Sequence, residues 1–292
     1  MSAAANGGGA MPVYVLTLSC SDRIGIVADV SHFLVEHACN ILESAQYGDA
    51  DNGRFFLRTV FESTQGRSLD EISHAFAPVA ARYAMEARFF DTAARTPTLI
   101  MVSRLGHCLN DLLFRWRIGA LPIEVKAVVS NHRDFEDLAT SFGLPFHWLP
   151  VSPETKAAQE GVLDELLASL GIELIVLARY MQILSGDFCA RQVGRIINIH
   201  HSFLPSFMGA RPYHRAHERG VKLIGATAHY VTKDLDEGPI IEQAVERVSH
   251  SFSVDDYVAV GRDVEALVLA RAVKWHAERR VLLNGRRTVV FQ

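Results

Sequence analysis

The feature that most constrains how this chain folds is a series of short, continuous apolar runs separated by helix-length segments. The runs include TLIMVS (98–103), IEVKAVVSN (123–131), IELIVLA (172–178) and RIINIH (195–200). A strand that is apolar at successive positions is buried on both faces, which is typical of a parallel sheet covered by helices. The chain from residue 97 onward is therefore predicted to form an α/β domain with a mostly parallel sheet.

The first ninety residues follow a different pattern. Strand-like and helix-like segments occur in the order βαββαβ, with an Asp-Asn-Gly turn at 51–53 between the two middle strands. This order predicts a compact α+β unit that is complete without the rest of the chain. The polar stretch TAARTPT, which contains Pro97, marks the boundary. We expect a disordered tail over 1–11, a first domain over 12–93 and a second over 97–292.

Composition excludes several classes of protein. The net charge of −4 gives no electrostatic reason to expect a nucleic-acid or anionic-membrane partner. The longest apolar runs are too short to cross a bilayer, and the first residues lack the basic and apolar regions of a secretory signal. Four cysteines are scattered without a CxxC pair, which favours a reducing compartment. We therefore expect a soluble, cytoplasmic protein.

The segment IINIHHS (196–202) places polar side chains at the end of an apolar strand. Alternation along a strand predicts that Asn198 and His200 face one side and His201 the other, which argues against a metal ion shared by the two histidines. His214 and His217 are spaced to pair on a helix, but no acidic metal signature accompanies them. The alternative is that His200 is a buried histidine with no role beyond packing.

A second polar segment, KDLDEGP (233–239), lies between two strand-like runs. Gly238 and Pro239 predict a turn of defined shape that holds Asp236 in a fixed direction, whereas Asp234 and Glu237 are read as solvated. A carbonyl reaction needs a donor to the oxyanion, a proton shuttle and a group that orients the nucleophile. Asn198, His200 and Asp236 have these chemical types. Ser103 and Asn131 also lie at carboxyl ends of predicted strands, where such folds bind ligands.

Other mechanisms find little support in the sequence. There is no GxSxG motif and no cysteine with a histidine signature, so a covalent nucleophile is disfavoured. The segment SRLGHCLND (103–111) contains neither GxGxxG nor a P-loop lysine pattern, so a nucleotide site is disfavoured too.

Three segments carry a family resemblance: LARYMQILS (177–185), NIHHSFLPSFMGARPYHRA (198–216) and ATAHYVTKDLDEGPIIEQ (226–243). Together they resemble the formyltetrahydrofolate hydrolase branch of the folate-dependent formyltransferase family, over roughly 97–292. The resemblance implies a Rossmann-like catalytic domain that hydrolyses 10-formyltetrahydrofolate with water and without a metal or other cofactor. It further implies a role in one-carbon metabolism, supplying formate for purine biosynthesis. The family's asparagine, histidine and aspartate match Asn198, His200 and Asp236.

The resemblance also implies the residues that contact the folate. These are Met181, Gln182, Ile183, Leu184, His201, Ser202, Val231 and Asp234. Transferases of the family usually have proline after NIH and an early glycine-rich loop for the acceptor's phosphate. This chain has His201 and SRLGHCLNDLL at those positions, and without an anion cradle the natural nucleophile is water.

The first domain, from VLTLSCSDRIGIVADV onward, resembles the ACT family. That family has a ferredoxin-like βαββαβ fold and often binds amino acids between paired copies. The resemblance implies an amino-acid effector site at Asp22, Ile24, Gly25 and Ile26, although these could equally be turn and packing residues. It also implies a homo-oligomer, which is the better supported of the two expectations.

The sequence leaves three alternatives to the hydrolase open. A transferase would need an amine acceptor, a metal hydrolase would lose activity to chelators, and an amino-acid sensor would bind an effector without catalysis.

Overall fold

The computed structural model describes residues 11–204 and 212–292. Residues 1–10 of the predicted tail lie outside this range, as does the part of the histidine motif from Pro205 to Arg211. The chain divides into two compact units, Met1–Ala94 with Phe291–Gln292 and Arg95–Val290. Across the described residues, no helix combines the length and the apolar character needed to cross a membrane.

The first unit is an antiparallel sheet packed against two helices. Its elements are β1 (Val13–Ser21), α1 (Ile26–Glu36), β2 (Cys39–Asp49), β3 (Arg54–Ser63), α2 (Leu69–Tyr83) and β4 (Glu86–Asp91). The strand order is β2-β3-β1-β4, which is the ferredoxin-like arrangement that the ACT resemblance implied. Leu16 and Leu18 of β1 pack against Phe33 of α1 and Phe76 of α2. Ser68 and Glu71 form a capping box that fixes where α2 begins.

The second unit is a seven-stranded sheet in the order β11-β10-β9-β8-β5-β6-β7. Its elements are β5 (Thr96–Val102), α3 (His107–Arg117), β6 (Ile123–Ser130), α4 (Glu136–Ser141), β7 (Phe146–Trp148), α5 (Lys156–Ser169), β8 (Leu174–Leu177), α6 (Gly186–Arg191), β9 (Ile196–His200), α7 (Pro212–Glu218), β10 (Leu223–Tyr230), β11 (Ile240–Arg247) and α8 (Val254–Ala277). Strands β9, β8, β5, β6 and β7 are parallel. Strands β10 and β11 are antiparallel, so the predicted mostly parallel sheet is confirmed.

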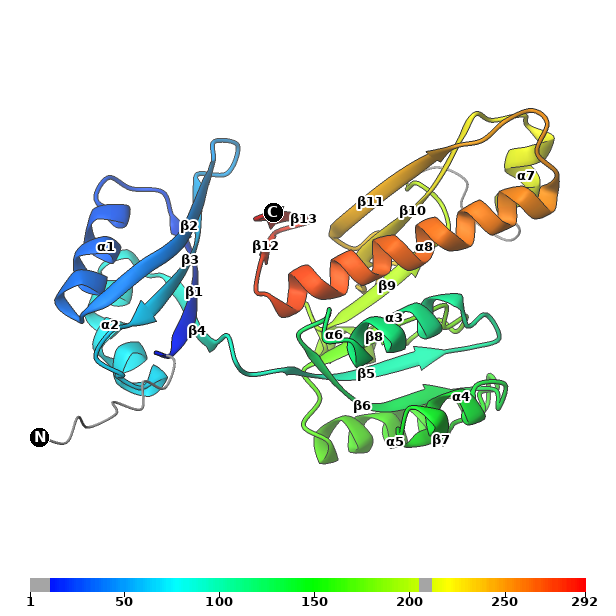
Figure 1. Ribbon diagram of the computed structural model, residues 1–292, viewed down its shortest axis with the longest axis horizontal. Helices are drawn as coiled ribbons and strands as arrows, with labels where there is room; N and C mark the ends of the chain where they lie inside the picture. Colours follow the sequence, from blue (N-terminus) through cyan, green and yellow to red (C-terminus); the bar gives the residue numbers. More distant parts are fainter. Residues whose placement is uncertain (1–10, 205–211) are drawn as a thin grey trace, which may run out of the picture. The chain divides into compact units, whose positions relative to one another are not determined.

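Helices cover both faces of this sheet, as the continuous apolar strands predicted (Figure 1). In β5, Ile100 and Val102 face the core formed with α3 and α8. Leu99 and Met101 face the opposite core, formed with α5 and α6. A second capping box, between Ser253 and Asp256, fixes the start of α8.

Two predicted elements differ from those observed. After the apolar run 123–131 the sequence predicts a helix around 132–142, but the helix is confined to α4, because residues 131–135 form bends and turns after β6. The sequence predicts a short tail over NGRRTVVF (284–291), but this segment contributes to a β-hairpin of β12 (Val281–Asn284) and β13 (Arg287–Val290), which turns at Gly285. The turn signal Asn-Gly was present in the sequence, but β12 is too short to show a clear alternation.

Candidate active site

The candidate site begins where the sheet changes from parallel to antiparallel. Strand β9 pairs with β8 on one side and with the antiparallel β10 on the other. The register places His229 of β10 directly opposite Asn198 of β9. Asn198 and His200 both line one cavity, as does Ile199, and Ile197 and Ile199 belong to the core. Asn198 contacts His229 and His200 contacts Asp236, which lies 3.7 Å from His229, so Asn198 and His200 face the same side, as alternation along the strand predicts.

Asp236 reaches the same place from the loop between β10 and β11. It has a left-handed backbone conformation, with φ of 55°. Two residues later, a Cβ on Gly238 would lie 1.7 Å from the carbonyl oxygen of Tyr230, so only glycine fits there. The backbone N–H of Tyr230 donates to the carbonyl of Pro239 at 2.9 Å and closes the loop. The turn at Gly238 and Pro239 thus holds Asp236 in a defined direction.

The three residues singled out from the sequence lie together. Asp236 Oδ2 is 3.2 Å from His200 Nδ1, and Asp236 Oδ1 is 3.7 Å from His229 Nε2. Asn198 Nδ2 is 3.3 Å from His229 Nε2. His229 Nδ1 donates to the carbonyl of Tyr230 at 2.9 Å, which turns its Nε2 toward Asn198 and Asp236. His229 Nε2 therefore lies between the amide of Asn198 and the carboxylate of Asp236, and it can accept from the amide when the ring is neutral or donate to the carboxylate when the ring is protonated.

Electrostatics favour an ionised Asp236. Burial raises the pKa of this carboxyl group, but the hydrogen bonds and positive charge of His200 and His229 outweigh burial. The net result is a pKa well below the ordinary range. His200 is 5% exposed, and its Nε2 is buried without a hydrogen-bond partner among the described residues. An unpaired buried nitrogen is costly unless a ligand completes it.

The cavity beside these residues has a volume of about 430 Å³, within the usual range for small-molecule sites. Seven of the eight residues predicted to contact substrate line it: Met181, Gln182, Ile183, Leu184, His201, Val231 and Asp234. Met181 and Ile183 are more than half exposed, which leaves an apolar wall open to a ligand. Ser202 is not among the lining residues. It is buried, and its carbonyl accepts a hydrogen bond from Thr227.

Buried polar groups hold the loop that carries Met181. The hydroxyl of Ser103, at the end of β5, donates to Asn131 Oδ1 at 2.7 Å and accepts from the backbone N–H of Met181 at 3.0 Å. At the other end of the loop, Glu160 accepts from the backbone N–H and the hydroxyl of Ser185. The ends of three parallel strands thus meet beside the cavity, as expected for this class of sheet.

The structure corrects the prediction that His200 and His201 face opposite sides. Their ring centroids are 5.0 Å apart, and both residues line the cavity. Strand β9 ends at His200, so alternation no longer applies to the next residue. Burial lowers the pKa of His201 to about 4, and the nearby charges of Arg179 and His200 act in the same direction.

Two further lining residues, His229 and Arg179, were not singled out from the sequence. His229 stands in the apolar run ATAHYV, and a histidine within an apolar strand is the sequence signal that could have identified it as a site residue. Arg179 follows β8 with a positive φ of 63°, which no sequence pattern revealed.

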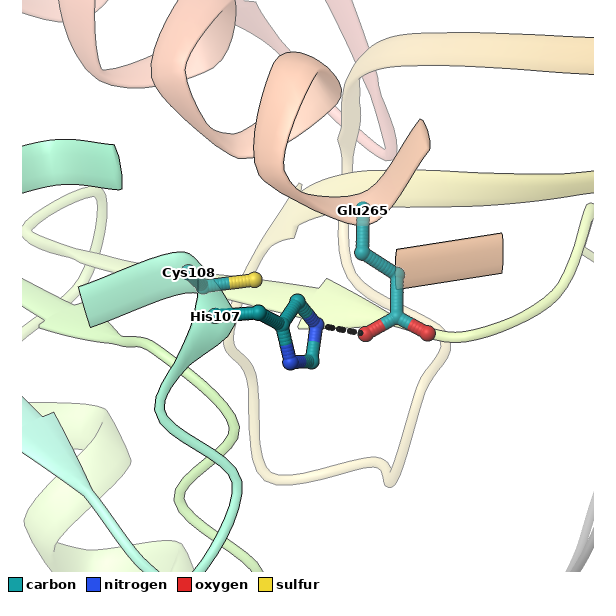
Figure 2. Close-up of side chains that lie close together, drawn as sticks. All are labelled: His107, Cys108 and Glu265. Atoms are coloured by element: carbon teal, nitrogen blue, oxygen red, sulfur yellow. Dashed lines mark hydrogen bonds and ion pairs between the residues drawn. The ribbon is translucent and has the colours of Figure 1, made fainter. Parts of the chain in front are cut away.

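Within the described ranges, one group of side chains has metal-ligand types: His107, Cys108 and Glu265 (Figure 2). Its carboxylate is already satisfied. Glu265 Oε2 is 2.8 Å from His107 Nε2 and 3.3 Å from Arg179 Nε, and Oε1 accepts from the hydroxyl of Tyr213 at 2.5 Å. Burial, followed by the charge of Glu265, raises the pKa of the Cys108 thiol well above its usual value. A protonated thiol beside a guanidinium is a poor cation site, and we read the group as an internal ion-pair network.

The first unit has a cavity of its own, with a volume of about 490 Å³. Three of the predicted effector residues, Asp22, Gly25 and Ile26, line it together with Arg23. Ile24 does not line it and is fully exposed.

Comparisons with known proteins identify the family of this chain. Residues 97–273 match the model of the formyl transferase family. The formyltetrahydrofolate deformylase of Corynebacterium sp. (strain P-1) is 51% identical over 280 residues, which cover 96% of this chain and 98% of that protein. The chain belongs to the formyltetrahydrofolate deformylase family.

Solved structures place the family within a wider group. The crystal structure of formyltetrahydrofolate deformylase from Burkholderia mallei is 55% identical and covers 96% of this chain and all of that chain, with a TM-score of 0.93. A glycinamide ribonucleotide transformylase from Symbiobacterium toebii is 31% identical and covers 68% of this chain and 95% of that one, with a TM-score of 0.63. The deformylase family thus shares its α/β fold with transferases.

The depressed pKa of Asp236 makes a testable contribution to stability. A carboxyl group whose pKa is lowered by folding stabilises the folded state above its unfolded pKa of about 3.9, and this stability is lost as the pH falls through the folded pKa. The advantage of the wild type over Asp236→Asn in free energy of unfolding should therefore shrink below about pH 4, by up to about 1.4 kcal/mol per pH unit.

Tryptophan fluorescence during denaturant titration measures this difference, because Trp116, Trp148 and Trp275 all lie in the second unit. Asp234→Asn makes the same chemical change two residues away and serves as the control. An advantage that stays constant from pH 5 to pH 3 would contradict the ion-pair assignment.

Proposed function

We propose that this protein hydrolyses 10-formyltetrahydrofolate to formate and tetrahydrofolate. The observation that carries the proposal is the Asp236–His200 pair, with the unpaired His200 Nε2, at a cavity walled by the 181–184 loop. The names of the relatives point to the same reaction. Hydrolysis of a formamide needs an oxyanion site and an oriented water, and the cavity offers groups for both.

In the proposed mechanism, the formyl oxygen lies near Asn198 and His200. Water oriented by the Asp236 carboxylate attacks the formyl carbon and gives one proton to Asp236. Asn198 donates to the oxyanion, and protonated His200, with Asp236 as its counter-charge, stabilises it. The carbon–nitrogen bond then breaks, and Asp236 passes the proton to the departing folate nitrogen. Formate and tetrahydrofolate leave, and no metal enters any step.

The walls of the cavity support a position for the pterin. We place it against the loop Met181–Leu184 and the segment Val231–Asp234, where exposed apolar side chains face open space. Lys233, which also lines the cavity, offers a cation to the carboxylates of the folate tail. The four cysteines are free, which supports a reducing compartment such as the cytoplasm.

The function is tested by incubating the protein with 10-formyltetrahydrofolate, no amine acceptor and excess chelator. We expect stoichiometric formate and tetrahydrofolate. Asp236→Asn and His200→Ala should each reduce turnover by about 100- to 1,000-fold, because each removes a group that acts in the transition state, while folate binding stays measurable. Asp134→Asn and His147→Ala make the same changes away from the cavity and serve as controls.

Three outcomes would contradict the assignment. Turnover at the wild-type rate by either active-site variant would contradict the catalytic role proposed for the substituted residue, Asp236 or His200. Release of tetrahydrofolate only after an amine acceptor is added, with formyl transfer to that acceptor in place of hydrolysis, would favour a transferase. Loss of activity to the chelator, with stoichiometric metal in the untreated protein, would favour a metal hydrolase.

For the first unit we propose an ACT domain that binds an amino-acid effector and mediates homo-oligomerisation. The βαββαβ order and the strand order support the domain type. The opposite charges of Asp22 and Arg23 at one cavity fit the ammonium and carboxylate groups of an amino acid. Exposed apolar side chains in this unit, including Ile24, Val35 and Leu42, supply a surface for oligomer contacts.

Isothermal calorimetry with the twenty amino acids tests the effector site. We expect at least one amino acid to bind, and Asp22→Asn to remove its heat of binding because the ammonium group loses its partner. Arg88→Gln, a charge change on β4 outside the cavity, is the control. Equal binding by Asp22→Asn and the wild type, or no binding by either, would refute the proposed site.

A further inference from the structure

His201 is the cavity-lining histidine to which the mechanism above gives no role. Its ring lies next to that of His200, with centroids 5.0 Å apart, and against the ring of Tyr213 at 6.5 Å. Both contacts are edge-on ring contacts. Among the described residues, its ring nitrogens have no hydrogen-bond partner, although the residue borders the cavity that holds Asp236. Within the described part of the chain, packing alone holds this polar ring, which leaves its nitrogens available to a small polar molecule.

The Tyr213 ring, which contacts the His201 ring, is itself held in place by its neighbours. Tyr213 of α7 packs on Gly261 of α8, where an added Cβ would lie 2.2 Å from the tyrosine ring. One turn further along α8, Glu265 accepts the tyrosine hydroxyl at 2.5 Å. Glu265 is 1% exposed and is held in turn by His107 and Arg179. Tyr213 is therefore fixed at both its face and its hydroxyl, and it fixes one side of His201.

The charged groups around His201 determine its protonation. Burial comes first, and Arg179 and His200 also lower its pKa, whereas Glu265 and Asp236 act in the opposite direction more weakly. The net pKa of about 4 keeps the imidazole neutral near pH 7. A neutral imidazole has one N–H donor and one bare acceptor nitrogen on different sides of the ring, and the bare nitrogen can accept an O–H of a bound water molecule.

We propose that His201 holds the attacking water beside Asp236, and that Tyr213 and Glu265 are positioning residues that keep His201 in place. This inference rests on the proposed hydrolysis and specifies which side chain selects water as the nucleophile. Asp236 takes the proton of the attacking water, and His201 forms a second hydrogen bond to the same molecule. The water is then oriented by two groups and not by one.

The test measures formate release by His201→Phe, which keeps an aromatic ring against Tyr213 but removes both nitrogens. We expect turnover to fall by about 100-fold, because the attacking water is no longer held in position, and we expect the KM for the folate to stay nearly unchanged. His201→Gln retains one donor and one acceptor and should keep a larger share of wild-type turnover. Should His201→Phe fail to fold, His201→Leu replaces it in the same comparison.

A second measurement separates water binding from a structural role. Hydroxylamine is added as an alternative nucleophile, whose nitrogen attacks the formyl carbon to give formohydroxamate and tetrahydrofolate. If His201 holds water, His201→Phe should slow attack by water more than attack by hydroxylamine. The ratio of hydroxamate to formate, corrected for the uncatalysed reaction, should then rise by about tenfold. A merely structural role lowers both products together and leaves the ratio unchanged.

The positioning role of Tyr213 is tested with two glycine variants. Gly261→Ala should displace Tyr213 and raise the same ratio, whereas Gly161→Ala, in α5 with no atom within 4 Å of the added Cβ, should leave it unchanged. Formate release by the wild type, combined with an unchanged ratio in His201→Phe, would overturn this inference alone. Absence of formate release by the wild type would overturn the proposed function itself.

Discussion

The ion pair between Asp236 and His200 is the interaction on which the rest of this site depends. An isolated carboxylate at this depth would be destabilised by burial, and the two histidines on either side make its charged form favourable. Each partner comes from a different element: His200 from the end of β9, His229 from the antiparallel β10, and Asp236 from a loop with a left-handed turn. The change from parallel to antiparallel pairing in the sheet is what brings them together.

A second buried carboxylate, Glu265, shows how differently the same group can be used. Both of its oxygens are occupied by His107, Arg179 and Tyr213. It therefore serves as an internal counter-charge that stiffens one wall of the cavity. Asp236 has a side chain that is 21% exposed and borders the cavity, so its charge is available to a reacting molecule. The surroundings of each carboxylate decide its role.

Part of this arrangement was predictable from the sequence. Continuous apolar strands indicated the parallel sheet, and the positions of Asn198, His200 and Asp236 at strand ends and in a shaped turn indicated the polar centre. The role of His229 was not predictable, because it depends on the register between β9 and β10, which no local pattern encodes. The placement of His201 was mispredicted because alternation was extended one residue past the end of the strand. Ser202 was predicted to contact the folate from the family resemblance, whereas in the structure its carbonyl oxygen accepts a hydrogen bond from the hydroxyl of Thr227.

In the proposed mechanism the formyl group is held between Asn198, His200 and Asp236. The most direct measurement is a crystal structure of the protein with a non-hydrolysable 10-substituted folate that carries a carbonyl or hydrated carbonyl group. We expect the oxygen of that carbonyl to lie within hydrogen-bonding distance, about 2.7–3.1 Å, of Asn198 Nδ2 and His200 Nε2, with a water or hydroxyl oxygen beside Asp236. A carbonyl group bound away from these three side chains would contradict the proposed mechanism.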